Sequence, residues 1–342
     1  MQINNIISEN NFVETLCRNF KRSNLQVNKL NESDAELISL PNTSLKMAVT
    51  TDVISEEIEK GLYTDPYQIG WMTVMINASD ISAVGAEPLG LLLNETFIES
   101  DMPEYISEIQ RGINDACEAT GFCVLGGDTN FSSVRQFGAT AIGLINDDIV
   151  VTRKGCDKED IVYISGYVGR GSAYALTKIY ETGKNIKYMP ESRIEHGKIM
   201  RKYATCCMDT SDGVVTTLDQ LMRVNKKGFK IDANPCEYID AESIEMAKMV
   251  NKSPLIMLAG QHGEFELVFT VNENDNSAFL KEAKTFGWNP IRIGTVMNEL
   301  NISLATKSLI YYPDTAKIRN LLAETNGKTE EYIKELFKMF DF

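Results

Sequence analysis

Histidine and long apolar runs are scarce in this chain of 342 residues, which contains two histidines, His196 and His262. Two are too few for a histidine-rich zinc or iron site. The best apolar window, residues 69–76, is far shorter than the roughly 20 residues that a membrane-spanning helix needs. The first residues contain no basic segment followed by an apolar one. We therefore expect no secretory signal and no membrane partner.

Basic residues are also in deficit, because 34 lysines and arginines stand against 48 acidic residues and leave a net charge of −14. This balance argues against binding to nucleic acid. The seven cysteines form no Cys-x-x-Cys pair, so we expect reduced, mostly buried thiols, Cys17 among them, in a cytoplasmic protein. Aspartate remains as the side chain for binding metals, and it favours hard cations such as Mg²⁺.

The length is about twice that of a domain of roughly 150 residues, which predicts two domains. In the first half, apolar runs alternate with helical patterns, which is typical of an α/β layer. Asp65-Pro66 and Pro103 mark the starts of its two helices, and the second helix ends at Gly121. The strands are expected near residues 47–51, 91–93, 122–125 and 139–142.

The second half also mixes predicted strands and helices. Its strands are predicted near residues 161–164, 228–232, 267–271 and 291–296. Its helices are predicted from near 171, near 190–203 and near 213–225. Two terminal helical segments are also predicted, one near 314–324 and one that carries Tyr332, Leu336, Phe337 and Phe340. The boundaries follow as 1–148 for the N-terminal domain, 149–313 for the C-terminal domain and 314–342 for a helical extension. We interpret the extension as a solvated packing element.

Four aspartates, Asp52, Asp80, Asp128 and Asp212, stand near the predicted ends of strands or helices. Ligands of α/β sheets gather where strands end. Carboxylates that converge there repel one another unless a cation neutralises them, and Mg²⁺ carrying nucleotide phosphates is such a cation. The sequence therefore predicts that these four side chains share one cleft of about 10 Å, a span that allows two or three such ions.

Each aspartate also has a simpler interpretation. Asp212, taken alone, is better explained as the N-cap of the next helix. The segment 126–129 is compatible with an ordinary turn, and Asp52 with a cap of the helix that follows it. Asp80 has the weakest alternative, because an acid at a helix C-terminus meets the unfavourable end of the helix dipole. The combination of the four is more specific than any one of them.

Several motifs occur together in this order, and the block Asn77–Pro88 is the most specific of them. The others are Thr50–Asp52, Gly126–Thr129, Val151–Gly155, Asp160–Gly171, Arg193, Asp209–Gly213 and Gly263–Val271. The set resembles the thiamine-monophosphate kinase branch of the aminoimidazole-ribonucleotide-synthetase-like superfamily, over residues from about 23 to about 300.

This resemblance implies a homodimer of N-terminal α/β domains with a C-terminal α+β domain outside each, so the expected fold class as a whole is α/β (α+β). It also implies Mg²⁺ as cofactor, ATP as substrate and a small-molecule phosphate acceptor such as thiamine monophosphate, whose phosphate receives the terminal phosphoryl group. The implied metal ligands are Asp34, Asp52, Asp80, Asp128, Asp209 and Asp212. The implied nucleotide contacts are Thr51, Asn77, Gly126, Gly127, Asp128, Thr129 and Ser211. Asp128, Asp212 and Arg153 are the implied catalytic residues, and Arg153 would compensate phosphate charge.

The chain departs from the family pattern in four places. Glu32-Ser33-Asp34 stands where a Gly-Asp-Asp is usual, Val53–Glu57 contains no histidine, and Glu264-Phe265-Glu266 has one acid moved or removed. The usual aromatic C-terminal segment has no match after Tyr312. Two alternatives to the kinase therefore stay open. One is another ATP-using member, hydrogenase-maturation-like or cyclo-ligase-like, and the other is a non-catalytic nucleotide-binding assembly protein.

No Walker-type phosphate loop is present, since Gly183-Lys184 is followed by asparagine rather than by a hydroxyl residue. The glycine-rich segment 166–172 opens a helix, and two interpretations of it are about equal. It either holds an anion at the helix N-terminus or serves as a packing turn.

Overall fold

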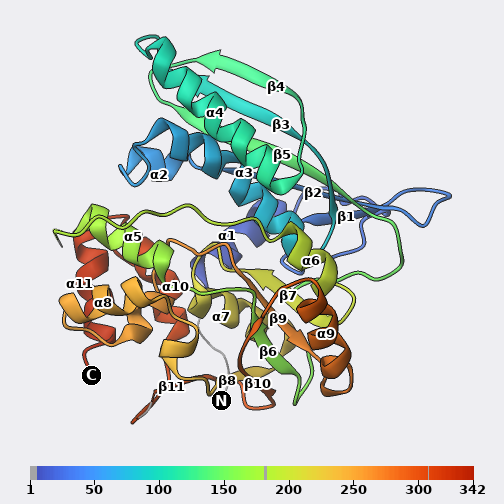
Figure 1. The fold of residues 1–342 in the computed structure, drawn as a ribbon, viewed down its shortest axis with the longest axis vertical. Coiled ribbons are helices and arrows are strands. Elements are labelled where there is room, and N and C mark those ends of the chain that lie inside the picture. The colour runs from blue at the N-terminus through green and yellow to red at the C-terminus, as the bar shows by residue number, and fades with distance from the viewer. Residues whose placement is uncertain (1–5, 181–182, 307) are drawn as a thin grey trace.

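The computed structural model describes residues 6–180, 183–306 and 308–342. Two β-sheets, each covered by helices, make up the molecule, and the expected mixed α/β class is confirmed (Figure 1). The first sheet has the order β1-β2-β5-β3-β4. Its strands are β1 (Glu36–Ser39), β2 (Lys46–Val53), β3 (Glu87–Phe97), β4 (Val124–Phe131) and β5 (Gln136–Ile145).

The second sheet has the order β12-β11-β8-β10-β6-β9-β7. Its strands are β6 (Ile161–Ile164), β7 (Ala204–Asp209), β8 (Gly228–Ile231), β9 (Leu267–Val271), β10 (Ile291–Met297), β11 (Ile302–Ala305) and β12 (Ile310–Tyr311). Both sheets are mixed, because β4 runs parallel to β3 and β11 runs parallel to β8, while the remaining pairs are antiparallel.

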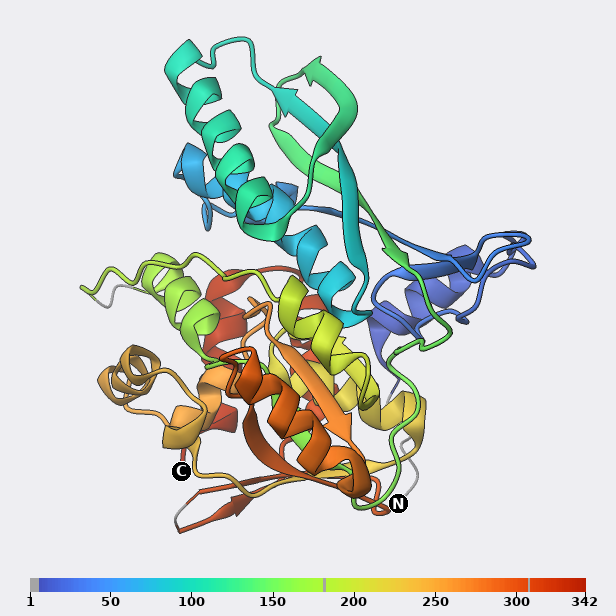
Figure 2. The same ribbon diagram turned by 45° about the vertical axis from the view of Figure 1, so that its right-hand side comes forward.

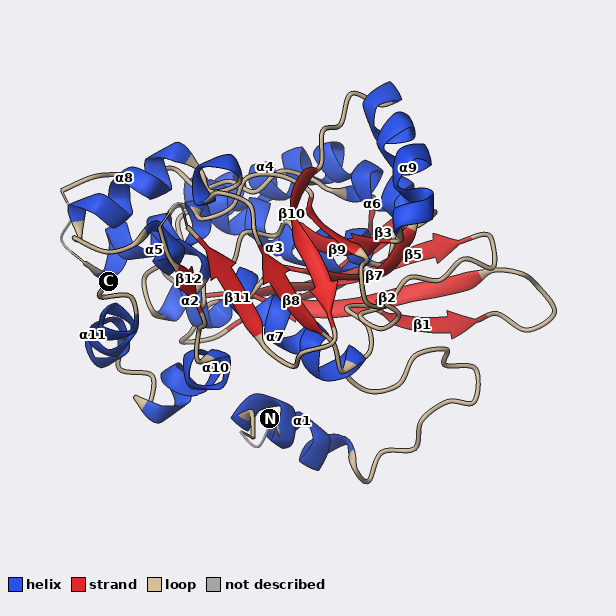
Figure 3. Ribbon diagram, turned by 90° about the horizontal axis from the view of Figure 1, so that it is seen from below, coloured by secondary structure: helices blue, strands red, loops and turns tan. Residues whose placement is uncertain are grey.

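Helices of the first half are α1 (Ser8–Cys17), α2 (Ser55–Glu59), α3 (Pro66–Ala83) and α4 (Pro103–Thr120). Those of the second half are α5 (Arg170–Ile179), α6 (Ile194–Met200), α7 (Val214–Asn225), α8 (Ala241–Met249) and α9 (Glu273–Thr285). The extension forms α10 (Thr315–Glu324) and α11 (Thr329–Met339). α10 packs on α7 and α11, and the ring of Tyr180 at the end of α5 contacts that of Phe337 in α11. Seen from below, α1, α7 and α10 lie on one side of the second sheet (Figure 3). None of the described helices is both long and apolar enough to cross a membrane.

Helix α3 lies at the centre of the molecule, between the first sheet and the second half of the chain (Figure 2). It begins where predicted, since the Asp65 side chain accepts a hydrogen bond from the amide of Tyr67 and Pro66 occupies the first turn. Fourteen of its 18 residues are buried, because β2, β5, α4, α6 and β7 all pack on it. The helix is therefore covered on nearly every side rather than on one face alone.

Helices α3 and α4 approach each other closely through two glycines. A Cβ on Gly70 would lie 2.0 Å from the carbonyl oxygen of Ile109, and one on Gly112 would lie 2.1 Å from that of Tyr67. Both backbones therefore fill the space that a side chain would need. This crossing fixes α3 against the sheet and so positions Asp80, which α3 carries.

Replacing Gly112 by alanine should therefore lower the free energy of unfolding by about 2 kcal/mol, as overpacking of a close contact does. Chemical denaturation followed by circular dichroism measures the change. Ser107→Ala, on the exposed side of α4, is the matched control. Equal stability of Gly112→Ala and the control would contradict the close crossing.

Several local predictions were wrong. Asp128 lies inside β4 rather than at a strand end, because parallel pairing with β3 continues through residues 126–131. Asp80 does not end its helix, which continues to Ala83. Cys17 is only partly buried, since α1 packs with none of its residues buried. The Asp212 side chain makes no capping bond, and Gly213 is the N-cap of α7.

Candidate active site

Three aspartates from distant parts of the chain converge where the two halves of the molecule meet. Asp34 precedes β1, Asp80 lies in the last turns of α3, and Asp209 ends β7. One carboxylate oxygen of each lies within 4.8 Å of the others, and among the described residues this is the group of three or more acidic, histidine or cysteine ligands close enough to hold a metal ion. We call these three residues the carboxylate cluster.

Neighbouring side chains hold the carboxylate cluster in place. The hydroxyl of Thr50 donates to Asp80 Oδ2 at 2.5 Å, and that of Ser79 donates to Asp209 Oδ2 at 2.6 Å. Arg153 Nη2 donates to Asp34 Oδ1 at 2.9 Å. The second oxygen of Asp34 is buried and has no hydrogen-bond partner among the described residues. One acceptor of the cluster is therefore still available to a ligand.

Burial and mutual repulsion raise the pKa values of two members of the cluster, Asp80 and Asp209. Burial, followed by the charges of Asp209 and Asp34, raises the pKa of Asp80 well above its usual value. Burial and the charge of Asp34 raise the pKa of Asp209 to about 7. One guanidinium, that of Arg153, faces three carboxylates, so negative charge is in excess. Three hard oxygen donors with an excess of negative charge fit a hard divalent cation such as Mg²⁺.

Asp52 and Asp212 lie near the carboxylate cluster without belonging to it. Asp52 contributes to the raised pKa of Asp80, and its backbone amide donates to Asn77 Oδ1 at 3.1 Å. Burial raises the pKa of Asp52, and burial together with the charge of Glu9 raises the pKa of Asp212 to about 6. The charge of Asp52 also contributes to the raised pKa of Asp212, which lies in the loop between β7 and α7. The acidic region thus extends from the cluster through Asp52 to Asp212.

Thr51 and Ser211 stabilise the surroundings of the carboxylate cluster through hydrogen bonds of their hydroxyl groups. The Thr51 hydroxyl donates to the carbonyl oxygen of Ala139 at 3.0 Å, which ties β2 to β5. The Ser211 hydroxyl donates to Asp209 Oδ1 at 3.2 Å and so orients one member of the carboxylate cluster.

Asp128 and its neighbours stand apart from the carboxylate cluster within one copy of the chain. All eight residues of β4, including Gly126, Gly127 and Thr129, are exposed at the edge of the first sheet. The side-chain amide of Asn130 donates to Asp128 Oδ2 at 2.7 Å. A Cβ on Gly127 would lie 2.2 Å from the carbonyl oxygen of Leu93, so within the chain this glycine permits close approach of β3.

A carboxylate of the chain itself occupies the N-terminus of α5, next to the glycine-rich turn. The carboxylate of Glu264 accepts hydrogen bonds from the amide of Gly171 at 2.8 Å and from that of Ser172 at 3.3 Å. Glu264 therefore occupies the position at the helix N-terminus where an anion would bind. Of the two interpretations of this turn, the structure supports the packing turn.

Three residues near the site were not predicted as site residues. Ser79 lies inside the Asn77–Pro88 block and bonds to Asp209, so the motif itself contained the signal. Burial, followed by charges that include that of Asp52, raises the pKa of Glu57 to about 6. His262 is buried, and its Nε2 lies 2.8 Å from the hydroxyl of Tyr63. As one of only two histidines, it could have been singled out by its rarity.

Comparison with known proteins gives a consistent result. A family model described as "AIR synthase related protein, N-terminal domain" matches residues 32–145. A thiamine-monophosphate kinase of Methanospirillum hungatei is 30% identical over 70% of this chain and 79% of its own length. One of Nitrosopumilus maritimus is 28% identical over 78% of this chain and 87% of its own length.

Solved structures agree in fold. A structure described as AaThiL complexed with AMPPCP and TMP superposes with a TM-score of 0.70 at 20% identity, covering 91% of this chain and 98% of that one. The carboxylate cluster also lies on three motifs of the family pattern, those of Asp34, Asp80 and Asp209. The chain belongs to the aminoimidazole-ribonucleotide-synthetase-related superfamily, in the branch of the thiamine-monophosphate kinases.

Proposed function

We propose that this protein is an ATP- and Mg²⁺-dependent kinase that transfers the terminal phosphoryl group of ATP to the phosphate of thiamine monophosphate. The observation that carries the proposal is the convergence of Asp34, Asp80 and Asp209 in a chain whose relatives are thiamine-monophosphate kinases. Phosphoryl transfer requires positioning and charge neutralisation more than a protein nucleophile. An acidic cluster with one arginine beside it suits that requirement.

The residues of the cluster have distinct parts in this proposal. Asp34, Asp80 and Asp209 would hold Mg²⁺, which when bound neutralises phosphate charge. Ser79 and Thr50 orient two of these carboxylates through the bonds described above. Arg153 stays protonated, because Asp34 raises its pKa further against the opposite effect of burial. Its guanidinium can then share charge between Asp34 and a phosphate oxygen.

We also propose that two copies of the chain pair through β4, which would make Asp128 part of a shared site. The apolar side chains Val124, Leu125 and Phe131 of this edge strand are 48%, 54% and 63% exposed. An exposed strand edge with apolar side chains is a ready surface for pairing with another chain. In such a dimer, the Gly126–Thr129 segment and Asp52 and Asp212 would serve the nucleotide and its metal ions as the family pattern implies.

The direct test is incubation of the purified protein with thiamine monophosphate, ATP and Mg²⁺, followed by chromatography for thiamine diphosphate. The proposal expects product that depends on Mg²⁺ and that is lost in Asp128→Asn. Turnover of ATP with a different acceptor only would favour another member of the superfamily. ATP binding without turnover across a panel of metabolites would favour a nucleotide-binding assembly protein.

Leu125→Glu should convert the dimer to a monomer, because a buried unpaired carboxylate at the interface costs several kcal/mol. Sedimentation velocity measures the change in mass. Leu280→Glu, an equally drastic change at a 38% exposed position of α9, should leave the mass unchanged. A wild-type protein that sediments as a monomer at high concentration would refute the pairing.

A further inference from the structure

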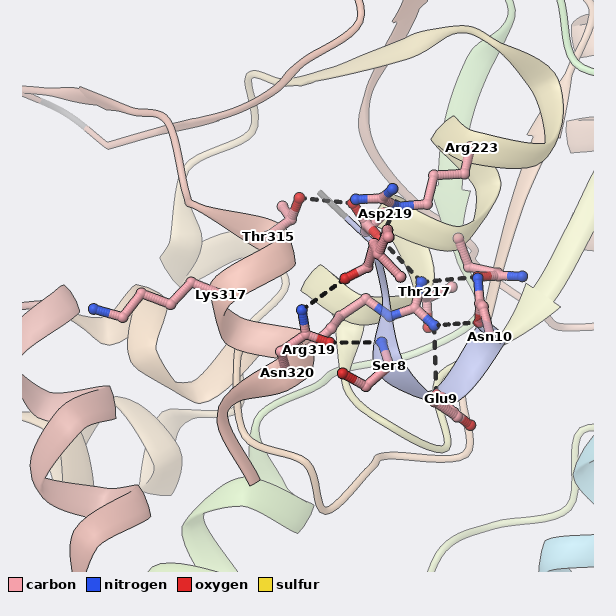
Figure 4. Close-up of polar contacts among 12 residues, drawn as sticks. Ser8, Glu9, Asn10, Thr217, Asp219, Arg223, Thr315, Lys317, Arg319 and Asn320 are labelled. Carbon is pink, nitrogen blue, oxygen red and sulfur yellow. Dashed lines mark hydrogen bonds and ion pairs between the residues drawn. The ribbon is translucent and has the colours of Figure 1, made fainter. Parts of the chain in front are cut away.

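Buried charged side chains meet where α1, α7 and α10 come together, outside the carboxylate cluster (Figure 4). The side chains of Arg319 in α10 and Asp219 in α7 are 4% and 0% exposed, and Arg319 Nη1 donates to Asp219 Oδ2 at 3.0 Å. Thr315 donates to Asp219 Oδ1 at 2.7 Å, and Arg223 Nε donates to Asp219 Oδ2 at 2.6 Å. A carboxylate buried this completely needs such partners, because an unpaired charge in the interior is very costly. The contacts therefore hold α10 at a fixed place on α7.

Arg319 also holds α1 at this place. Its Nη1 donates to Gln220 Oε1 at 2.8 Å, and its Nη2 donates to Asn10 Oδ1 at 3.0 Å. The side-chain amide of Asn10 donates in turn to Gln220 Oε1 at 3.0 Å, which closes a ring of hydrogen bonds among three helices. Because a guanidinium presents its donors in one rigid plane, these acceptors fix α1, α7 and α10 relative to one another. We call Arg319, Asp219, Gln220 and Asn10 the arginine junction.

Helix α7 connects the arginine junction to the carboxylate cluster. It follows the loop of residues 210–213 directly, and nine of its 12 residues are buried. Thr217 lies two residues before Asp219, and its hydroxyl donates to the carbonyl oxygen of Asp209 at 2.8 Å. The backbone of Asp209, a member of the cluster, is thus tied to the start of the helix that Arg319 holds. A displacement of α7 would therefore move Asp209.

The loop between Asp209 and α7 has little freedom to absorb such a displacement. A Cβ on Gly213, whose φ is +83°, would lie 2.4 Å from the carbonyl oxygen of Gly260. A Cβ on Gly263 would lie 2.1 Å from the carbonyl oxygen of Thr210, which also accepts a hydrogen bond from the Gly213 amide at 3.0 Å. Backbone therefore packs directly on backbone along this loop, and interiors packed this closely transmit strain.

We propose that Arg319 is a positioning residue of the metal site, because it fixes α7 through Asp219 and thereby the place of Asp209. Arg319 lies in the C-terminal extension, beyond about residue 300, where the sequence resemblance to the family ends. The extension therefore does more than the solvated packing expected from its charges, since it helps to build a site whose ligands belong to family motifs. The proposal rests on the metal site of the proposed function, but the order of the loop can be measured without metal.

Two substitutions at opposite ends of this connection test the proposal. Arg319→Lys keeps the charge, but one ammonium group cannot reach all three acceptors of the arginine junction. Thr217→Val has nearly the same shape and removes the hydroxyl that holds Asp209. In the metal-free protein, each should accelerate amide hydrogen exchange of residues 209–213 at least tenfold, measured by mass spectrometry. Thr217→Ser keeps the hydroxyl, and Lys317→Gln removes an exposed charge of α10 that points away from the junction (Figure 4), so both should leave this exchange unchanged.

Binding of Mn²⁺, followed by electron paramagnetic resonance, measures the consequence for the metal site without turnover. Arg319→Lys and Thr217→Val should each raise the dissociation constant at least fivefold, whereas Lys317→Gln should leave it within twofold. In steady-state kinetics the same two variants should raise the Mg²⁺ concentration for half-maximal rate, with the KM for thiamine monophosphate unchanged. The double variant should bind Mn²⁺ no more weakly than Thr217→Val alone, because Arg319 then has no connection left to act through. Additive losses would overturn the connection through α7.

The outcomes separate this proposal from the proposed function. If the wild type makes thiamine diphosphate, but Arg319→Lys leaves exchange and Mn²⁺ binding within twofold, the proposal is overturned and the function stands. If the wild type makes no product, the function fails and hydrogen exchange alone decides. Faster exchange in Arg319→Lys and Thr217→Val then supports the proposal, and exchange equal to that of Lys317→Gln overturns it. If Arg319→Lys does not fold, Thr315→Val takes its place, because it removes one hydrogen bond to the carboxylate of the junction. It should accelerate exchange of the loop about threefold, and unchanged exchange overturns the proposal.

Discussion

Asp80→Asn should lower kcat by about a thousandfold and, in the absence of Mg²⁺, raise the temperature of thermal unfolding. The first effect follows because an amide neutralises one of three carboxylates that would hold the cation, and loss of one preorganised charge commonly costs 10²–10³ in rate. The second follows because Asp80 is buried beside Asp209 and Asp34, whose charges raise its pKa. Asparagine is close to isosteric and can still accept the hydrogen bond from Thr50.

Steady-state kinetics and scanning calorimetry with and without Mg²⁺ measure the two effects on the same preparation. Asp148→Asn is the control, since the Asp148 side chain is 96% exposed and removal of one surface charge there should change neither quantity. A loss of activity together with a gain in thermal stability would identify a functional site whose charges oppose folding. A variant that loses both activity and stability would instead show that the carboxylate of Asp80 is a structural group.

Stability without metal should fall as the pH rises from about 5 to 8, and Mg²⁺ should reverse the loss at the upper end. The carboxyl of Asp209 has its pKa raised from 3.8 to about 7 by burial and the charge of Asp34, and that of Asp80 is raised as well. Between pH 3.8 and about pH 7, the folded state therefore binds more protons than the unfolded state. Its stability is therefore greatest at low pH and declines as the protons are lost.

Thermal unfolding in a pH series, with EDTA or with millimolar Mg²⁺, tests this dependence. We expect an increase of several degrees on adding Mg²⁺ at pH 8 and little change at pH 5, because a cation binds the deprotonated cluster. Asp80→Asn should reduce both the pH dependence and the Mg²⁺ effect. An equal Mg²⁺ effect at pH 5 and pH 8 would argue that the ion binds elsewhere.

Local patterns predicted part of the regular elements well. The strand at 161–164 matches β6, and the helix start at Asp65-Pro66 matches α3, because an apolar run or a capping pair depends on few neighbours. The terminal helices also lie close to their predicted bounds. The helices α8 and α9 and the short strands β1, β7, β11 and β12 were missed. The short strands are stabilised by pairing with other strands, as β7 is by the distant β9, and a local pattern does not record that pairing.

The glycines of segment 126–129 illustrate the opposite case. Gly-Gly-Asp is typical of a turn, yet parallel pairing with β3 keeps this segment extended. Strand pairing outweighs the local preference, because each residue gains hydrogen bonds and packing from a partner that the local sequence does not specify. Asp128 is therefore carried to an exposed sheet edge, away from the aspartates with which it was grouped.

By itself the sequence determined the fold class, the family and the residue types of the site, because alternating patterns and short motifs record local chemistry. It also identified Asp34, Asp80 and Asp209 through the family pattern, and the tertiary structure decided that these three, rather than the four aspartates first grouped, are the ones in mutual contact. Distances between residues far apart in the chain are set by how sheets and helices pack, and local patterns do not contain that information.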